Sequence, residues 1–311
     1  MTIYWSPAVF GWNYATALIE LCSLGREITF LSVLEPRMSE PKHDQVRSRN
    51  EPFVQRVATR IWNELPSDDN PYIASHALCH GYDLFELMEK RSFVDVFYLL
   101  FRGELPSKAD AQLLQTLMIA LINPGPRHPA TRAAMNVGVG KTDPVHILPI
   151  AAAVLGGEYA GGGIVEASMR FLRKQQKSSA QQTAEQVLQQ YELTTNVDEQ
   201  LVIAPGFGRH HGGVDVLAKN IAAQLCALEA SGAALQWGCQ LAAQLEPKGI
   251  GWMTTGIAAA VFADLGFQPR AGGSLFQLLG APGLVAHGIE LANKPITAMP
   301  FVSDENYVIE R

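Results

Sequence analysis

The sequence predicts a mostly or wholly α-helical fold. From Ser92 onward, helix-capping patterns are followed by apolar residues at helical spacing. After residue 58, the sequence contains no run of alternating β-branched residues of the kind that is typical of a strand. Segments rich in Ala and Gly towards the C-terminus allow helices to approach one another closely. We therefore expect about a dozen helices of ordinary length.

Length and charge limit the possible functions. The 311 residues suffice for two domains, or for one large core with a smaller inserted lobe. Apolar residues make up 48% of the chain and charged residues 17%, so we expect no long disordered segment. The net charge of −6 argues against a general affinity for nucleic acid, which needs clustered Lys and Arg. The basic stretch Arg170–Lys177 is more typical of a solvated helix end.

The N-terminal segment is not predicted to enter a membrane. Ile3–Leu34 is apolar, but Glu20, Arg26 and Glu27 interrupt it and no basic region precedes it. We therefore expect neither a signal peptide nor a membrane span, and a cytoplasmic protein. Residues 1–58 are expected to form an arm and a loop-rich connection. The arm carries an aromatic patch of Tyr4, Trp5, Phe10, Trp12 and Tyr14. Because so much aromatic surface must be covered, we expect the arm to pack either on its own domain or on a second subunit.

The four cysteines show no metal-binding or redox spacing. Cys22, Cys79, Cys226 and Cys239 form no CxxC pair and have no His at ligand spacing. We therefore expect reduced, mostly buried thiols.

Four histidines outside the central loop are not expected to bind a metal. His76 and His80 are spaced i, i+4 but lack a third ligand, and no metal site is predicted. His146 and His287 lie on apolar helix faces, where we expect core or interface positions.

Helix signals follow one another along the rest of the chain. Ser92 with Asp95, and Ser107 with Asp110, fit a capping pattern and predict two amphipathic helices. Further helices are predicted from Thr142 to Gly156, from Ser179 to Glu192, along Val214–Leu228, and over 232–244, 252–265 and 273–291.

Two glycine-rich segments are the candidate functional loops. Ile203–Lys219, IAPGFGRHHGGVDVLAK, places an arginine and two adjacent histidines in a polar loop before a helix. Gly156–Gly163, GGEYAGGG, also ends at a helix start. Exposed backbone N–H groups at such turns can hold phosphates or a carboxylate. A solvated turn, a flexible linker or a close helix contact would explain the same composition, and no dinucleotide fingerprint is present.

Five ordered segments carry a resemblance to a known family. They are TRIWNELP, GYDLFELMEKRSFVDVFYLLFRGELPS, HPATRAAMNVGVGKTDPVHILPIAAAVLGG, PGFG and SLFQLLGAPGLVAHGIELANKP, within residues 59 to 300. Together they resemble the citrate synthase superfamily, and most of all its short citryl-CoA lyase-like branch. The resemblance implies an all-α subunit, a large helical domain with a smaller one inserted, a homodimer, and a site that closes around an acyl-CoA and a carboxylic acid.

The resemblance also implies a chemistry with defined requirements. Making or breaking a carbon–carbon bond beside a thioester needs a carboxylate base and hydrogen-bond donors for the developing oxyanions. Arginines are needed to bind the acid's carboxylates in a bidentate manner. No tightly bound cofactor is implied, since coenzyme A enters as substrate or ligand.

The sequence departs from the family's pattern at the positions that carry this chemistry. Ala160 or Gly161 stands where the family has a donor histidine, and Arg209 stands in place of the second histidine, followed by His210 and His211. The family's Asp-Pro-Arg becomes Asp215, Val216 and Leu217. Trp252 falls where the catalytic aspartate is expected, and no carboxylate lies nearby in sequence. Near the C-terminus, Lys294 replaces an arginine.

Three interpretations follow. The protein is an enzyme with rebuilt chemistry acting on a carboxylated acyl-CoA by a Claisen or retro-Claisen type reaction. In the second interpretation it is an inactive relative that binds acyl-CoA or pairs with a related subunit, and in the third it shares only the fold.

The candidate catalytic residues are Arg209, His210, His211 and Asp215. The candidate ligand-binding residues are Gly161, Gly162, Gly163, Gly206, Phe207, Gly208, Trp252, Thr254 and Lys294. The predicted domains are 1–58 (arm), 59–160 and 251–311 (large domain), and 161–250 (small domain).

Overall fold

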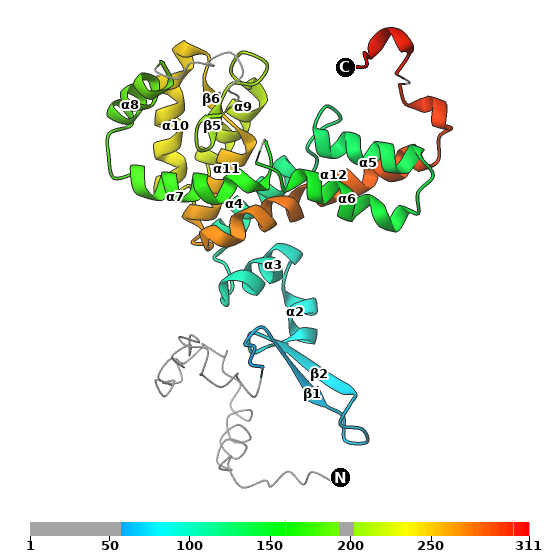
Figure 1. Cartoon of the computed structure of the whole chain (residues 1–311). Helices are drawn as coiled ribbons and strands as arrows, with labels where there is room; N and C mark the ends of the chain where they lie inside the picture. The colour runs from blue at the N-terminus through cyan, green and yellow to red at the C-terminus, as the bar shows by residue number, and fades with distance from the viewer. Residues whose placement is uncertain (1–56, 159, 193–201, 301, 311) are drawn as a thin grey trace, which may run out of the picture. The chain divides into compact units, whose positions relative to one another are not determined.

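The structure is a computed structural model that describes residues 57–158, 160–192, 202–300 and 302–310 (Figure 1). The chain divides into two units, 1–58 and 59–311, and all described helices and strands belong to the second. The predicted N-terminal arm, with its aromatic patch, lies outside the described residues apart from Val57 and Ala58.

A small antiparallel sheet opens the second unit. Strands β1 (Trp62–Pro66), β2 (Ala74–Cys79) and β3 (Tyr82–Asp83) are ordered β1-β2-β3. The fold is therefore mostly, and not wholly, α-helical, and the sequence showed no alternating pattern for these strands. β1 is exposed along its whole length, so no apolar alternation marks it, and cross-strand pairing rather than residue propensity defines these strands.

Three capped helices follow. Asp83 caps α2 (Leu84–Lys90), Ser92 and Asp95 form a full capping box on α3 (Phe93–Arg102), and Ser107 caps α4 (Lys108–Leu121). The two predictions based on Ser92 and Ser107 are confirmed.

Helices α5 (Pro129–Val139), α6 (Ile147–Leu155) and α12 (Gly272–Ala292) pack on one another (Figure 1). Small residues make this packing possible. A Cβ atom added to Gly138 of α5 would lie 2.0 Å from the carbonyl oxygen of Gly288 in α12. The expected close approach of Ala- and Gly-rich helices is thus present. The short turn Pro144–His146 precedes α6, and His146 is exposed, so it is not a core residue of the subunit. His287 lies 3.1 Å from the Asn123 side chain.

The remaining helices form the part of the molecule around α11 (Thr254–Asp264), which is buried on all sides over most of its length. They are α7 (Val165–Gln175), α8 (Ala180–Glu192), α9 (Val216–Cys226) and α10 (Ala233–Leu245). Helices α7, α9 and α10 pack on α11, and α8 packs on α10. A second small sheet, β4 (Val202–Ala204), β5 (Phe207–Gly208) and β6 (Gly251–Trp252), packs beside them. The predicted helices after residue 178 agree with these bounds to within a few residues.

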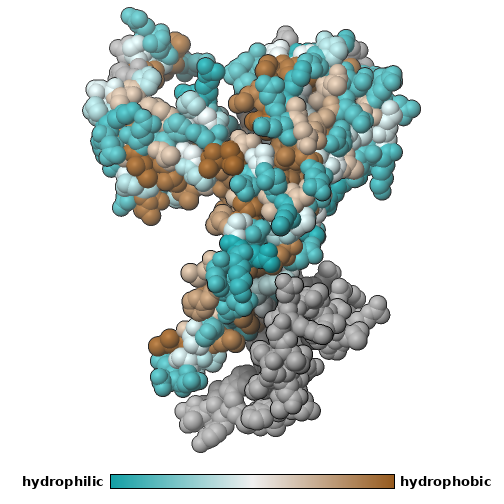
Figure 2. All heavy atoms as spheres, turned by 180° about the vertical axis from the view of Figure 1, so that it is seen from behind, coloured by the Kyte–Doolittle hydropathy of each residue, from teal (hydrophilic) through white to brown (hydrophobic). Residues whose placement is uncertain are grey.

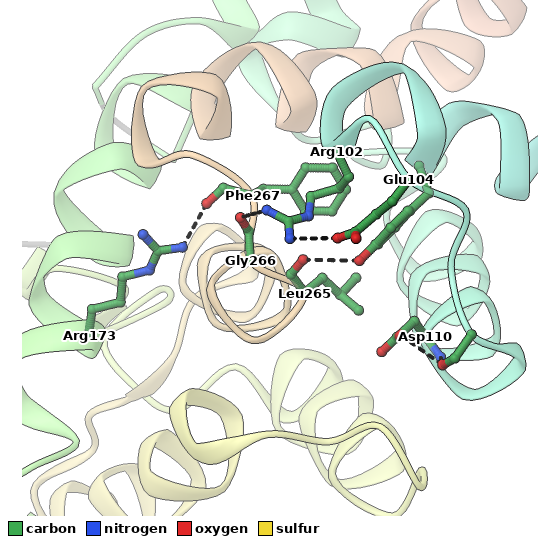
Figure 3. Close-up of polar contacts among 9 residues, drawn as sticks. Arg102, Glu104, Asp110, Arg173, Leu265, Gly266 and Phe267 are labelled. Carbon is green, nitrogen blue, oxygen red and sulfur yellow. Dashed lines mark hydrogen bonds and ion pairs between the residues drawn. The ribbon is translucent and has the colours of Figure 1, made fainter. Parts of the chain in front are cut away.

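Side chains from two other helices hold the carbonyl groups at the C-terminal end of α11 (Figure 3). Arg102 donates to the carbonyl oxygen of Gly266 at 2.5 Å, and Arg173 donates to that of Phe267 at 2.7 Å. Arg102 also pairs with Glu104 at 3.0 Å. Cationic donors near a helix C-terminus interact favourably with the negative end of the helix dipole. This network therefore stabilises the C-terminal end of α11.

The cysteine prediction needs correction. The sulfur atoms of Cys226 at the end of α9 and Cys239 in α10 are in contact, and their Cα atoms are 7.6 Å apart. This contact makes the pair a candidate disulfide, which the expectation of reduced thiols did not include, although the Cα separation is wider than the usual range for a disulfide. Their separation of 13 residues matches no sequence motif, and only the turn between the two helices brings them together. Cys79 is a free thiol whose pKa is raised by burial.

One helical segment of the described chain, Pro269–Ala292, has the length and apolar character needed to cross a bilayer. It contains α12, which buries nine residues against its neighbours, as the core helix of a folded domain does.

Candidate functional site

The segment predicted as a polar loop is an ordered hairpin. β4 and β5 pair across the turn at Pro205 and Gly206, and β5 pairs with β6. His210 and Gly213 exchange backbone hydrogen bonds of 2.7 and 3.1 Å, which closes a second turn. Gly206 has φ +87° and contacts Gly256 so closely that a Cβ atom on either would overlap the other. The need for glycine at position 206 is therefore explained by packing.

Trp252 fills the position where the family's carboxylate is expected. Its ring stacks on Phe207 with 4.4 Å between centroids and an interplanar angle of 28°. Only 2% of the residue is exposed, and its indole Nε1 has no hydrogen-bond partner. Two residues further on, at the start of α11, Thr254 is half-buried and Thr255 is fully buried with an unpartnered hydroxyl group.

The two acidic residues that flank this segment in the sequence are both engaged in other contacts. Glu246 pairs with Lys219 at 2.5 Å. Asp264 accepts hydrogen bonds from the backbone N–H groups of Gly232, Ala234 and Leu235 at 2.8 to 3.1 Å, which caps α10. Burial raises the pKa of Asp264, and these three bonds partly oppose the rise. Both carboxylates are thus engaged in structural contacts at the opposite ends of the segment.

Arg209 lies between the hairpin and two other elements. Its guanidinium lies over the ring of Tyr191 in α8, 5.3 Å from the centroid, and Nη2 donates to the carbonyl oxygen of Lys248 at 3.1 Å. Its Nε is buried without a partner. No carboxylate among the described residues forms an ion pair with Arg209.

The other three candidate catalytic residues differ in their surroundings. The rings of His210 and His211 meet edge to face at 4.4 Å, and both residues are exposed. His211 has φ +48°, which is strained for a residue other than glycine. Asp215 caps α9 by accepting from the N–H of Ala218 at 3.0 Å, so its carboxylate has a structural role.

A cavity of about 380 Å³ lies beside the hairpin. It is lined by Phe171, Val187, Gln190, Tyr191 and residues 202–205. Tyr191 connects it to Arg209, because its ring lines the cavity and also contacts the guanidinium.

The second glycine-rich segment folds back on itself after α6. The N–H of Gly163 donates to the carbonyl oxygen of Gly157 at 3.1 Å. A Cβ atom at Gly161 would lie 2.4 Å from the carbonyl oxygens of Leu155 and Gly157. A side chain of any size at 161 would therefore require the loop to move. A cavity of about 220 Å³ next to this loop is lined by Gly156, Gly162, Gly163, Glu166, Arg270, Gly273, Ser274 and Gln277.

His128 is a residue that the sequence analysis missed. It caps α5, and its ring reaches the glycine-rich loop at the carbonyl oxygen of Ala160, 3.2 Å away. Burial lowers its pKa, so the ring is neutral near pH 7. The only sequence signal was its place before Pro129, where polar side chains often cap helices.

The predicted site residues therefore fall into separate groups. The β4–β5–β6 sheet unites Gly206, Phe207, Gly208 and Trp252, with Arg209 adjoining. Gly161–Gly163 lie at the N-terminal end of α7 and contact α12 near Gly273. Lys294 follows the other end of α12 and pairs with Glu290. Since α12 has 21 residues, Lys294 and Gly273 are about 30 Å apart in one chain.

Comparison with known proteins gives a fold but no sequence family. No family model and no curated protein matches the chain. Among solved structures, the chain resembles citryl-CoA lyase from Hydrogenobacter thermophilus with a TM-score of 0.65 at 23% identity, covering 82% of this chain and 94% of that one.

Two further structures extend this likeness. ATP citrate lyase from Methanosaeta concilii, in complex with (3S)-citryl-CoA, matches with a TM-score of 0.59 at 15% identity over 98% of this chain and 47% of that one. Citrate synthase from Thermoplasma acidophilum, in complex with carboxymethyl coenzyme A and oxaloacetate, matches with a TM-score of 0.52 at 20% identity over 71% of this chain and 57% of that one. The chain described here thus has the helical fold of the citrate synthase superfamily.

Proposed function

We propose that this protein binds a carboxylated acyl-CoA thioester and does not carry out conventional Claisen condensation or cleavage. One observation carries the second part of the proposal. No Asp or Glu lies between Glu246 and Asp264, and both of these are engaged in structural contacts. A base normally accelerates such proton transfers by about 10² to 10⁴. Its loss at this position makes enolate formation by the usual route very slow.

The likeness to ligand-bound structures supports the first part of the proposal. Two of the similar proteins were solved with a CoA thioester or thioether bound. In this chain, the cavity beside Ile203–Pro205 has a volume of about 380 Å³ and a mainly apolar lining, which suits part of a small-molecule ligand such as an acyl-CoA. Arg209 contacts Tyr191, which lines the cavity, and no carboxylate among the described residues pairs with its guanidinium, so it is suited to binding an anionic group.

A second candidate is an enzyme with rebuilt chemistry. The adjacent rings of His210 and His211, next to Arg209, favour it, because imidazole can exchange protons near neutral pH and a guanidinium stabilises developing negative charge. Asp215 contributes less to this candidate than the sequence suggested, since its carboxylate caps α9.

We also propose that the protein forms a homodimer, or pairs with a related subunit. Helix α6, ILPIAAAVL, contains no polar residue, yet only Ile147, Ala151 and Leu155 are buried. Leu148, Ile150 and Val154 are each about two-fifths exposed (39%, 43% and 40%). Figure 2 shows hydrophobic residues at the surface in the part of the molecule that carries α5, α6 and α12. A helix that is apolar all round is normally buried, so a partner surface is expected here.

Calorimetry and proton exchange test the two parts of the functional proposal separately. We expect the protein to bind citryl-CoA and acetyl-CoA. We also expect the rate at which the acetyl-CoA methyl protons exchange in D₂O to equal that of buffer. His210→Ala and His211→Ala should leave this exchange unchanged, as should the control His146→Ala, which alters an exposed histidine elsewhere.

The same measurements identify the alternatives. Exchange above the buffer rate that is lost in His210→Ala but kept in His146→Ala would establish the rebuilt enzyme. If the protein binds no CoA ester, it shares only its fold with the similar solved structures.

A further inference from the structure

His128 sits at a junction between two segments that are distant in the sequence. His128 precedes Pro129 and is the N-cap of α5. Its ring contacts Ala160, which is 32 positions further along the sequence. The residue is half-buried, so the ring is held between the helix start and the loop.

The two ring nitrogens have different partners, and this fixes the tautomer. The N–H of Ala130 donates to Nδ1 at 3.1 Å, so Nδ1 must carry a lone pair. The proton of the neutral ring then resides on Nε2, which donates to the carbonyl oxygen of Ala160 at 3.2 Å. One side chain thus satisfies an unpaired N–H group of α5 and a carbonyl group of the loop.

The loop needs such an external contact. Ala160 has φ +55°, a left-handed conformation that costs free energy for any residue other than glycine. The neighbouring Gly161 has no side chain that could anchor the loop. Among the described residues of this turn, the N–H groups of Gly157 and Gly163 donate to the carbonyl oxygens of Val154 and Gly157. His128 joins the loop to a separate helix.

The position of the loop determines the shape of the smaller cavity. Gly156, Gly162 and Gly163 form one wall of the 220 Å³ space, and Arg270 and Ser274 lie on the other side. Gly162 also contacts the backbone of Gly273 so closely that a Cβ atom would lie 2.7 Å from its carbonyl oxygen. A shift of the loop would therefore change both the wall and its packing on α12.

We infer that His128 is a positioning residue, which holds the described part of the glycine-rich loop, residues 156–158 and 160–163, in the conformation that forms this cavity wall. The Nε2–H bond to Ala160 stabilises the left-handed backbone there, while Nδ1 ties the same ring to α5. The functional importance of the loop rests on the proposed acyl-CoA binding, and on the ligand also occupying the 220 Å³ cavity that the loop lines. The structural role of His128 is independent of that binding.

Two substitutions separate the two contacts. In His128→Asn, the amide oxygen takes the place of Nδ1 and keeps the α5 cap, but the side chain is too short to reach Ala160. In His128→Gln, the amide nitrogen takes the place of Nε2 and can still donate to Ala160, but the cap is lost. Comparison of these variants distinguishes positioning of the loop from stabilisation of the helix.

Amide hydrogen exchange measured by NMR on the full chain is the test. For His128→Asn we expect the protection factors of Gly157 and Gly163 to fall about fivefold to tenfold, the effect of losing one hydrogen bond. Ala130 at the start of α5 and Gly140 at its end should keep theirs. For His128→Gln we expect the reverse, with Ala130 deprotected and the loop amides unchanged. If His128→Asn leaves Gly157 and Gly163 as protected as in the wild type, or if both variants loosen α5 and the loop equally, the inference is wrong.

Ligand binding provides an independent second measurement. We expect His128→Asn to weaken citryl-CoA binding by at least the same factor as it lowers loop protection, and His128→Gln to bind as the wild type does. If wild-type protein binds no CoA ester, the proposed function fails while the exchange results still decide the role of His128. If the wild type binds and His128→Asn binds equally well despite a deprotected loop, the loop does not shape the ligand site.

Discussion

At the scale of single residues, the altered positions are compatible with their surroundings. Trp252 is stacked and buried, and Gly161 is enclosed by carbonyl oxygens. Both residues therefore fit their local structure, and it stays a prediction that they stand where the family has a catalytic aspartate and a histidine. The sequence could show that a carboxylate and a histidine are absent, because both are visible as residue types. It could not show that the backbone around Gly161 has no room for a histidine, because that depends on how the loop folds.

Gly161→His should destabilise the protein instead of restoring a donor. The added Cβ atom would lie 2.4 Å from two backbone oxygens, so the loop must shift. We expect a loss of about 1–3 kcal/mol in the free energy of unfolding, as for other overpacked sites. Urea denaturation measures it. Gly213→Ala is the control, because nothing lies within 4 Å of the added atom and its loss should be small. Equal stability of Gly161→His and wild type would mean that the loop has room for a side chain.

The neutral form of His128 gives a defined pH dependence. Burial lowers its pKa in the folded state, so the unfolded chain binds more protons between the two pKa values, and stability rises with pH there. The contribution of His128 is fully present above the unfolded pKa of about 6.5 and is lost as the pH falls through the lower folded pKa. We expect the difference in unfolding free energy between wild type and His128→Asn to shrink from pH 8 to pH 5. A difference that is constant over this range would contradict the assigned tautomer.

At the scale of helices and strands, local signals predicted most helix starts, while long-range contacts determined the rest. The capping residues Ser92 and Ser107 act within three residues, so their effect is visible in the sequence. The cap of α10 comes from Asp264, about 30 positions away, and the cap of α5 comes from an imidazole. The short strands of both sheets likewise depend on pairing partners, which residue propensity does not reveal.

The contact between Cys226 in α9 and Cys239 in α10 predicts a measurable gain in stability when the two thiols are joined in a disulfide. Cross-linking residues 13 positions apart restricts the unfolded chain, and a loop of this size gives about 3 kcal/mol. We expect a reductant to lower the unfolding free energy of the wild type by about 2–3 kcal/mol. Cys226→Ser should be unaffected by the reductant. If wild type and Cys226→Ser respond identically, the bond is absent from the protein in solution. That result would restore the original expectation of reduced thiols, which suits the proposed cytoplasmic location.

At the scale of the whole molecule, the resemblance predicted the fold better than the site. The quoted segments lie on helices that build the core, such as α3, α5 and α12, and the similar solved structures confirm that architecture. The division into a large domain of 59–160 with 251–311 and a small domain of 161–250 stays a prediction. The candidate site residues lie in two regions, the hairpin, where Gly206 packs against Ser168 of α7, and the glycine-rich loop that precedes α7, with Lys294 beyond the far end of α12. A contribution of Lys294 to either region requires a second subunit, because α12 is too long for it to reach Gly273 within one chain.

The exposed side of α6 provides the test of that second subunit. Ile150 and Val154 lie one turn apart and together present apolar surface to solvent in the isolated chain. If this surface is covered by a partner copy, Ile150→Lys with Val154→Lys would bury two unpaired charges and dissociate the dimer. We expect sedimentation to show a dimer of about twice 33.9 kDa for the wild type and a monomer for the double variant. Val216→Lys with Leu217→Lys is the control, since these residues of α9 are more exposed (64% and 69%) and should tolerate charge without a change of mass. If the wild type is a monomer, the exposed side of α6 does not form a homodimer and a different partner would cover it. If both double variants dissociate alike, the dimer interface does not lie specifically on α6.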